Sequence, residues 1–236
     1  MKTVWILGIM AVATASVADI GELMEQAAND KGYAPLFAKD LSNAQLTEKM
    51  WQFKGDILQP TPERVTKPLP PKTGKKKPRH PRDIWSTKRY SNFIIDLEFK
   101  NAKDTNSGIF IRCGDIANWL QTTMEVQIMQ EDGKTPRNSI GSIYDCKAAD
   151  AKPKLNPVGE WNHYTVIAND NWIHVVLNGK LINSMDLNLW TEVGKNPDGS
   201  TNKFKTAYTD MPREGHVGLQ YHGQPVWFRN VRIKTL

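Results

Sequence analysis

A strict alternation of apolar and charged residues over residues 93–99 is the feature that most constrains how this chain can fold. One face of the segment carries the apolar residues Phe93, Ile95, Leu97 and Phe99, and the other carries the carboxylates of Asp96 and Glu98. Since successive side chains of a strand point to opposite faces, the pattern predicts a half-buried β-strand. The same pattern recurs, and it predicts further strands over 107–113, 123–129, 163–168, 172–177, 215–221 and 226–233.

Turn signals separate these strands. Asn169-Asp170-Asn171 predicts a tight hairpin turn, and Asn178-Gly179 predicts another in which both residues can take positive φ. Helical character is confined to residues 20–31, so no helices alternate with the strands. Many antiparallel strands without crossover helices predict an all-β sandwich or jelly roll. The 236 residues, 39% of them hydrophobic, suffice for one large domain or two small ones.

The first residues resemble a secretory leader. A charge at Lys2 precedes an apolar run over 4–13, and small residues follow, so we expect a signal peptide over 1–18. The run is shorter than the roughly 20 apolar residues of a spanning helix, and no later segment predicts a membrane span. The chain has two cysteines, Cys113 and Cys146, neither of which follows the leader as a lipoprotein requires. We therefore expect a periplasmic or secreted protein.

Export bears on the two cysteines. In an oxidising compartment Cys113 and Cys146 could pair, so a disulfide between them is expected. The chain has no Cys-x-x-Cys motif and no clustered histidines. A structural zinc site is therefore not indicated.

The net charge of +6 is concentrated in residues 72–82. This run ends a segment, Pro60 to Arg82, that contains seven prolines and that predicts an extended, solvated insertion. One basic loop without a basic helix or an aromatic RNA-binding signature does not favour nucleic acid as a partner. The insertion could bind an acidic polymer or a membrane surface, but a solubilising loop is the favoured interpretation.

Polar residues share the second face of two predicted strands. In 123–129 the apolar phase leaves Glu125 and Gln127 together, and in 217–222 it leaves Gln220 and His222. Arg112 is expected on the same strand face as Gly108 and Phe110, because the three residues are two positions apart. If these strands belong to one sheet, the five polar side chains converge; the alternative is that each face simply meets water. Such multi-donor groups suit sugar hydroxyls, and the eight tryptophans offer flat surfaces for sugar rings.

The strand over 123–129 lacks the carboxylate pair of an ordinary retaining glycosidase. Laminarinase-type sandwiches carry Glu-x-Asp-x-x-Glu on one strand, but here Glu125 is followed by Gln127 and Gln130, and Glu131 is out of register. Hydrolysis through a glycosyl-enzyme is therefore disfavoured. One Glu and one His remain for proton abstraction and donation.

An ordered set of short motifs extends from about Tyr33 to Leu236. The motifs are WSTKRYSNF (85–93), NSGIFIR (106–112), EVQI (125–128), GSIY (141–144), GEWN (159–162), LNG (177–179), GLQYHG (218–223) and FRN (228–230). Together they resemble the 3-keto-disaccharide hydrolase family, which is associated with 3-keto-glucoside 1,2-lyase and 3-keto-2-hydroxyglucal hydratase activity. The basic insertion departs from the family pattern and leaves open whether the site is an open groove or a covered pocket.

The resemblance implies a concanavalin A-like jelly roll of two antiparallel sheets with the site on its concave face. It also implies an enzyme that removes the C2 proton, which the C3 ketone acidifies, and expels the C1 substituent, with water added later. Glu125 and His222 are the implied acid and base. The implied substrate-binding residues are Lys88, Asn106, Arg112, Gln127, Tyr144 and Gln220. The family leaves a divalent metal open, but the sequence shows no ligand spacing that would identify one.

Two other functions stay open at this point. A non-catalytic carbohydrate-binding module is one, because lectins share the expected fold and a fold alone does not fix function. A structural or adhesive role that uses the basic insertion is the other.

Overall fold

The computed structural model describes residues 17–46, 49–62, 82–130, 133 and 135–236. They form two units, residues 17–31 and 32–236. The first contains helix α1 (Val17–Ala28), which begins and ends three residues earlier than the helical pattern suggests. Most of the predicted signal peptide and residues 63–81 of the basic insertion lie outside the described residues. Among the residues that the structure describes, no helix combines the length and apolar character needed to cross a bilayer.

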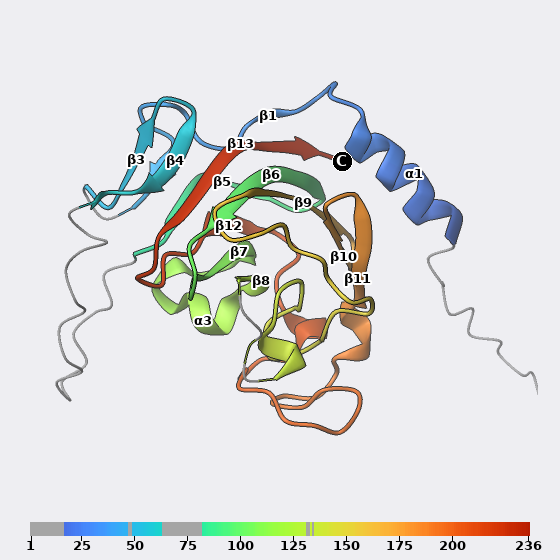
Figure 1. Ribbon diagram of the computed structural model, residues 1–236. Helices are drawn as coiled ribbons and strands as arrows, with labels where there is room; N and C mark the ends of the chain where they lie inside the picture. The colour runs from blue at the N-terminus through green and yellow to red at the C-terminus, as the bar shows by residue number, and fades with distance from the viewer. Residues whose placement is uncertain (1–16, 47–48, 63–81, 131–132, 134) are drawn as a thin grey trace, which may run out of the picture. The chain divides into compact units, whose positions relative to one another are not determined.

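The second unit is a sandwich of two antiparallel sheets (Figure 1), which confirms the predicted fold class. The larger sheet has the order β11-β10-β9-β6-β13-β4-β3, with β1 also paired to β13. Its strands are β1 (Ala34–Pro35), β3 (Trp51–Lys54), β4 (Ile57–Pro60), β6 (Phe93–Asn101), β9 (Trp161–Asn169), β10 (Trp172–Leu177), β11 (Lys180–Asp186) and β13 (Val226–Thr235).

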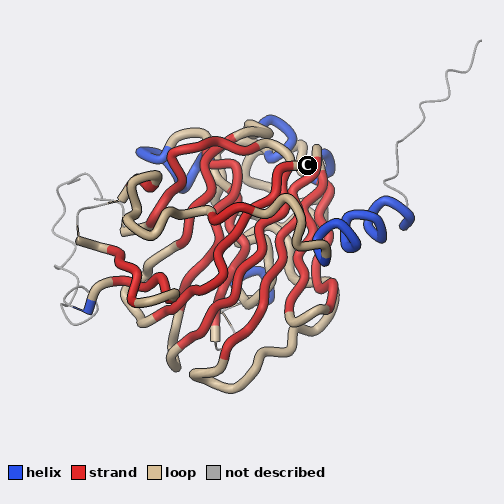
Figure 2. Tube along the Cα trace, turned by 90° about the horizontal axis from the view of Figure 1, so that it is seen from above, coloured by secondary structure: helices blue, strands red, loops and turns tan. Residues whose placement is uncertain are grey.

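The smaller sheet has the order β2-β5-β12-β7-β8. Its strands are β2 (Ala44–Gln45), β5 (Ile84–Tyr90), β7 (Asn106–Cys113), β8 (Met124–Met129) and β12 (Gly215–Leu219). All seven strands predicted from alternation are present, and none of their ends differs from the prediction by more than two residues. Figure 2 shows the strands side by side, with the loops gathered at their ends.

The apolar phases of both sheets meet in one core. Leu97 and Phe99 of β6 and Val126 of β8 are fully buried there, together with Val217 of β12. The turns are also as predicted. Only Asp170 and Asn171 connect β9 to β10, and between β10 and β11 both Asn178 (φ 49°) and Gly179 (φ 79°) have positive φ, as a type I′ turn requires.

Strand β7 contains a bulge that changes which way its last residues face. Phe110 pairs with Gly218 and Cys113 pairs with His216, so Ile111 and Arg112 together oppose a single residue of β12. Arg112 has φ 52°, in the left-handed region. An extra residue on one strand reverses the in-out order beyond it. Cys113 therefore belongs to a cluster with Trp85 and Phe110 instead of the main core.

Short helices occupy the connections. They are the 3-10 helices η1 (Ile116–Asn118), η2 (Pro136–Asn138), η3 (Leu187–Leu189) and η4 (Tyr208–Asp210) and the α-helix α3 (Trp119–Thr122). In Figure 1, α3 lies beside β7 and β8. The long connection between β11 and β12, residues 187–214, packs against the segment that follows β8 and against α3. Its Lys203 N donates to Asp145 Oδ2 (3.0 Å), and its Lys205 N donates to Gln121 Oε1 (2.8 Å).

Candidate functional site

Glu125 lies in the middle of β8, on the face of the smaller sheet turned away from the larger one, here called the outer face. It pairs with Phe110 of β7, and its side chain is 7% exposed. Met124 and Val126 on either side of it belong to the core, so the alternation of β8 forces Glu125 outward. The position confirms the strand phase predicted for this residue.

Two glycines make room on the outer face. A Cβ on Gly108 of β7 would lie 2.6 Å from Oε1 of Glu125, so the carboxyl rests directly on the β7 backbone. A Cβ on Gly218 of β12 would lie 2.6 Å from the Trp85 ring in the same way. Glycine at both positions therefore lets large side chains lie flat on the sheet.

The environment of Glu125 changes its acidity. The pKa of its carboxyl is raised to about 8, mainly because the group is buried; the charge of Lys203 opposes the rise, the charge of Asp83 adds to it, and a hydrogen bond from Gln220 opposes it. A carboxyl with such a pKa is present in both protonation states near neutral pH. It can therefore accept and donate a proton under the same conditions.

Two glutamines near Glu125, namely Gln127 on the same face of β8 and Gln220, which is the hydrogen-bond partner of Glu125, have buried side-chain oxygens without donors among the described residues. Gln127 Nε2 donates to Asn106 Oδ1 at 2.8 Å, which leaves the Gln127 Oε1 as a buried acceptor. Within the described part of the chain, neither this oxygen nor Oε1 of Gln220 has a hydrogen-bond partner. Buried acceptors without donors cost free energy unless a ligand or water supplies the donor. Sugar hydroxyls are donors of this kind.

Tyr144 and Lys203, both of which follow β8 in the chain, complete the polar part of the site. Tyr144 N donates to the Glu125 carbonyl at 2.9 Å, which places Tyr144 at the edge of β8. The Lys203 Nζ lies 3.9 Å from the centroid of the Tyr144 ring, a cation–π distance. Tyr144 was predicted as a substrate-binding residue, but Lys203 was not. It belongs to a long connection without strand or helix periodicity, so no sequence pattern pointed to it.

An aromatic stack, formed by Trp85, Phe110 and Trp119, covers the neighbouring part of the outer face. The Trp85 and Phe110 rings are parallel with centroids 4.8 Å apart, and Trp119 of α3 packs on Phe110 at 4.8 Å. Trp85 is fully buried and Trp119 is the partly exposed member. The stack thus presents Trp119 as the apolar surface nearest to solvent.

Arg112 does not join this group, and the predicted convergence of five polar side chains is wrong in this respect. The bulge turns its guanidinium away, where it donates to Ser91 O (2.8 Å), Asp170 O (2.7 Å) and Asn92 Oδ1 (3.1 Å). Burial lowers the Arg112 pKa to about 10. The side chain holds two turns together at the edge of the sandwich.

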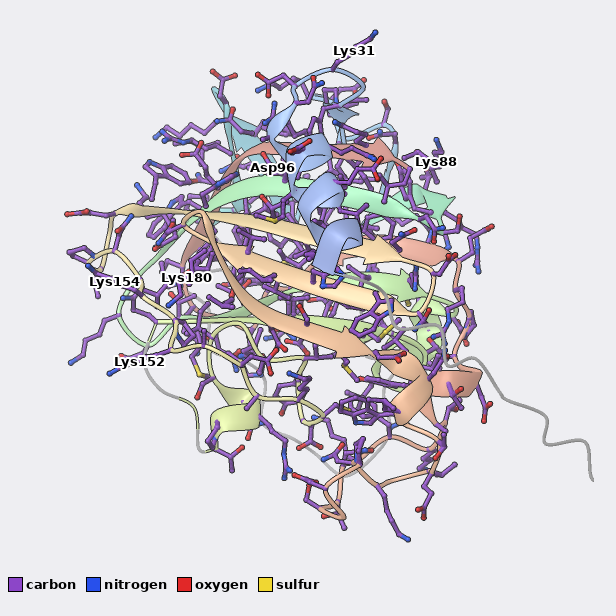
Figure 3. The ribbon with its side chains drawn as sticks, turned by 90° about the vertical axis from the view of Figure 1, so that its right-hand side faces the viewer. Lys31, Lys88, Asp96, Lys152, Lys154 and Lys180 are labelled. Carbon is purple, nitrogen blue, oxygen red and sulfur yellow. The ribbon has the colours of Figure 1, made fainter. Side chains whose placement is uncertain are left out.

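Two further predicted site residues, Lys88 and His222, lie on the exposed surface. Lys88 is exposed near the end of β5, with its Nζ 5.0 Å from the Tyr90 ring, and Figure 3 shows it at the periphery of the protein. His222 is exposed and follows the end of β12 by three residues. The roles of both residues stay predictions.

The predicted disulfide is wrong. Cys113 and Cys146 are both free and buried. The bulge in β7 carries Cys113 into the outer cluster with Trp85, whereas Cys146 lies in the main core, where its thiol contacts Tyr208. Burial raises the pKa of the Cys113 thiol to about 11 and that of Cys146 to about 12, so both stay protonated at neutral pH.

The side chains around Glu125 determine whether a divalent metal could bind there. In the described ranges, no three side chains of His, Cys, Asp or Glu come together as a metal site would require. The polar groups near Glu125 are mainly amides and a lysine, which are a poor ligand set for a tightly bound ion. The described side chains do not fit a metal, and no step proposed below depends on one.

Two solved structures that resemble this chain are described as glycosyl hydrolases. The structure of a "putative glycosyl hydrolase" from Parabacteroides distasonis ATCC 8503 is 30% identical, with a TM-score of 0.73, and the match covers 86% of this chain and 99% of that one. A second structure described in the same words from the same strain is 25% identical, with a TM-score of 0.67, over 90% and 96% of the two chains.

A curated relative and a family model agree with these structures. The relative, the 3-keto-disaccharide hydrolase of Bacteroides thetaiotaomicron, is 26% identical over 182 residues, which is 65% of this chain and 62% of the relative. The match thus spans less than two thirds of that protein. The model of the 3-keto-alpha-glucoside-1,2-lyase-like domain matches residues 32–234, nearly the whole sandwich, and the chain therefore belongs to this family.

Proposed function

We propose that this protein is an enzyme that cleaves 3-keto-glucosides by removing the C2 proton and eliminating the C1 substituent, and that it can hydrate the resulting 2-hydroxyglucal. The observation that carries the proposal is Glu125, a buried carboxyl with a pKa of about 8 that faces unpaired amide oxygens. Family membership supports the substrate class.

The chemistry needs a base but no carboxylate pair. A ketone at C3 stabilises the negative charge left when the C2 proton moves to Glu125, and the resulting enediolate expels the C1 oxygen as the C1–O bond breaks. The aglycone takes up a proton on leaving. Addition of water across the C1–C2 double bond then gives the free 3-keto sugar, so that the net change is hydrolysis without oxidation or reduction.

The remaining polar groups suit the recognition of a sugar. The Oε1 atoms of Gln127 and Gln220 can accept hydrogen bonds from sugar hydroxyls. Asn106 holds the Gln127 amide in the orientation that leaves its oxygen available. Trp119 offers an apolar ring face on the same side of the sheet. We assign His222 the second proton transfer, to the departing aglycone.

We also propose that the protein is exported to the periplasm or the medium. The support is the predicted signal peptide over residues 1–18. A 3-keto-glucoside formed outside the cytoplasm would then be within reach of the enzyme.

Product analysis tests the activity. The protein is incubated with a 3-keto-glucoside of a chromogenic aglycone and, as a matched control, with the same glucoside unoxidised. We expect aglycone release from the ketone alone, with a mass corresponding to 2-hydroxyglucal or its hydrate. Equal release from both substrates would contradict the proposal, because only the ketone acidifies C2. Binding of both without turnover would support a carbohydrate-binding module.

A further inference from the structure

We propose that Lys203 is a further catalytic residue of this site, the cation that binds the substrate oxygen on which negative charge develops. This inference rests on the proposed function, because it assigns a role within the same reaction. Lys203 lies in the connection between β11 and β12, for which no sequence pattern predicts an element.

The backbone around Lys203 is held on both sides of the outer face. Lys203 N donates to the Asp145 carboxylate at 3.0 Å, on the segment that follows β8. Two residues later, Lys205 N donates to Gln121 of α3 at 2.8 Å. The stretch 203–205 therefore bridges the two elements that flank the outer face of β7 and β8, and its position is fixed relative to Glu125.

The Lys203 side chain also has a defined resting place. Its Nζ lies 3.9 Å from the centroid of the Tyr144 ring, and Tyr144 is itself bonded through its backbone N–H to the Glu125 carbonyl. A ring face attracts an ammonium group but leaves its N–H donors able to bind an oxygen. Lys203 is exposed at this point, so a ligand can reach it.

The titratable groups that face Glu125 come from three separate elements. Two of them are charged, the ammonium of Lys203 and the carboxylate of Asp83 before β5, and the third, the phenol of Tyr208 in η4, is neutral. Loss of the C2 proton places a negative charge on the oxygen at C3 of the sugar, which is conjugated with C2. Of these three groups only Lys203 carries the charge that stabilises such an oxyanion.

Steady-state kinetics with the full chain and a chromogenic 3-keto-glucoside test the role. We expect Lys203→Met to lower kcat by about 10²- to 10³-fold with a smaller change in KM, as for a removed oxyanion contact. Lys203→Arg should recover part of the loss, because it restores the charge. Lys205→Met is the matched control: it removes an exposed lysine from the same connection and should stay within about twofold of the parent protein.

A titration that needs no substrate gives a second readout. The Glu125 carboxyl is followed by 13C NMR across the pH range, and Lys203→Met should raise its pKa while Lys205→Met should not. A kcat for Lys203→Met within threefold of the parent would overturn the inference, as would an unchanged Glu125 titration. An inactive parent protein would instead refute the proposed function, and the titration would still decide whether Lys203 faces Glu125.

Discussion

The outer faces of the two sheets each hold a carboxyl that is almost completely buried, but the two are treated in opposite ways. Asp96 of β6 is 4% exposed and Glu125 of β8 is 7% exposed. Asp96, whose place on β6 is visible in Figure 3, accepts hydrogen bonds from His163 (2.7 Å), Thr165 (2.8 Å) and Arg232 (3.0 Å). Although burial alone would raise its pKa, these partners outweigh it and the pKa is lowered.

The difference shows that burial does not by itself decide the acidity of a carboxyl. Neighbouring Glu98 on the larger sheet accepts from Arg229 at 2.9 and 2.7 Å and also has a lowered pKa. Glu125 has the Gln220 amide as its hydrogen-bond donor, and Lys203 as an opposite charge, and its pKa is raised. A structural carboxylate is supplied with cationic donors from its own sheet, whereas a carboxyl that must change protonation is left short of them.

The largest effect is expected from Glu125→Gln. Removing the base should lower turnover of a 3-keto-glucoside by roughly 10²- to 10⁴-fold. The raised pKa also has a consequence for folding: wild type loses stability as pH rises from about 4.5, the unfolded value, to about 8, the folded value. In urea denaturation, the free energy of unfolding of the variant should therefore rise relative to that of wild type by roughly 3–5 kcal/mol between pH 5 and pH 9.

A folded Glu125→Gln protein that keeps near-normal turnover would exclude Glu125 as the base. His222→Gln provides a parallel test, because removal of the proposed second proton group should also lower turnover. Equal denaturation curves for wild type and Glu125→Gln at pH 9 would mean that Glu125 titrates normally.

The next effect belongs to the paired carboxylate. Asp96→Asn leaves Arg232 and His163 without their anion and should lower the free energy of unfolding by about 2–3 kcal/mol at pH 7. Because the folded pKa of Asp96 is lowered, its contribution is present above about pH 3.8 and is lost as pH falls through the folded value. Because Asp96 also raises the pKa of His163, the deficit, read from urea denaturation, should be largest near pH 5 and shrink as pH rises through the His163 titration, while kcat changes by less than about twofold. A large loss of kcat would contradict this and show that Asp96 on the larger sheet also affects the site at Glu125 on the smaller sheet.

The smallest effect is expected from Gly108→Ala. The added Cβ would lie 2.6 Å from Glu125 Oε1, so the carboxyl must move, and turnover should fall by about 10- to 100-fold through lost alignment. Gly218→Ala is the matched control on the adjacent strand. Its Cβ meets the Trp85 ring and the Ile84 carbonyl, and it should reduce thermal stability more than activity. Unchanged kinetics for Gly108→Ala would show that the carboxyl position is not critical.

Much of the fold could be predicted because alternation is a local property. The apolar phases of β6 and β8 are visible in the sequence, and the pair Asn178-Gly179 takes the two positive φ values that its chemistry favours. The same phases placed Glu125 and Gln127 on one face. These inferences hold because each depends on residues only a few positions apart.

One bulge accounts for two errors. The extra residue in β7 is not visible as a pattern, so Arg112 was placed with Gly108 and Phe110, and Cys113, expected to pair with Cys146 because of export, was not recognised as a residue of the outer face. In the structure Arg112 leaves that face and Cys113 enters it. The two-residue alternation of side chains no longer predicts which face a residue occupies beyond a β-bulge.

Lys203 was missed for a different reason. Its place beside Tyr144 depends on the bond of its backbone N–H to Asp145, which lies 58 residues earlier. Nothing near Lys203 in the sequence distinguishes it from other lysines of the chain. Only the folded connection between β11 and β12 brings it to Glu125.

The buried guanidinium of Arg112 also bears on the order in which the sandwich assembles. It joins β7 to residues 20, 21 and 58 positions away, in the β5–β6 turn and the β9–β10 hairpin. Contacts between such distant segments form only after both sheets have largely come together, because long loops must close first. We therefore expect the Arg112 contacts to form late, so that their removal would speed unfolding more than it slows folding.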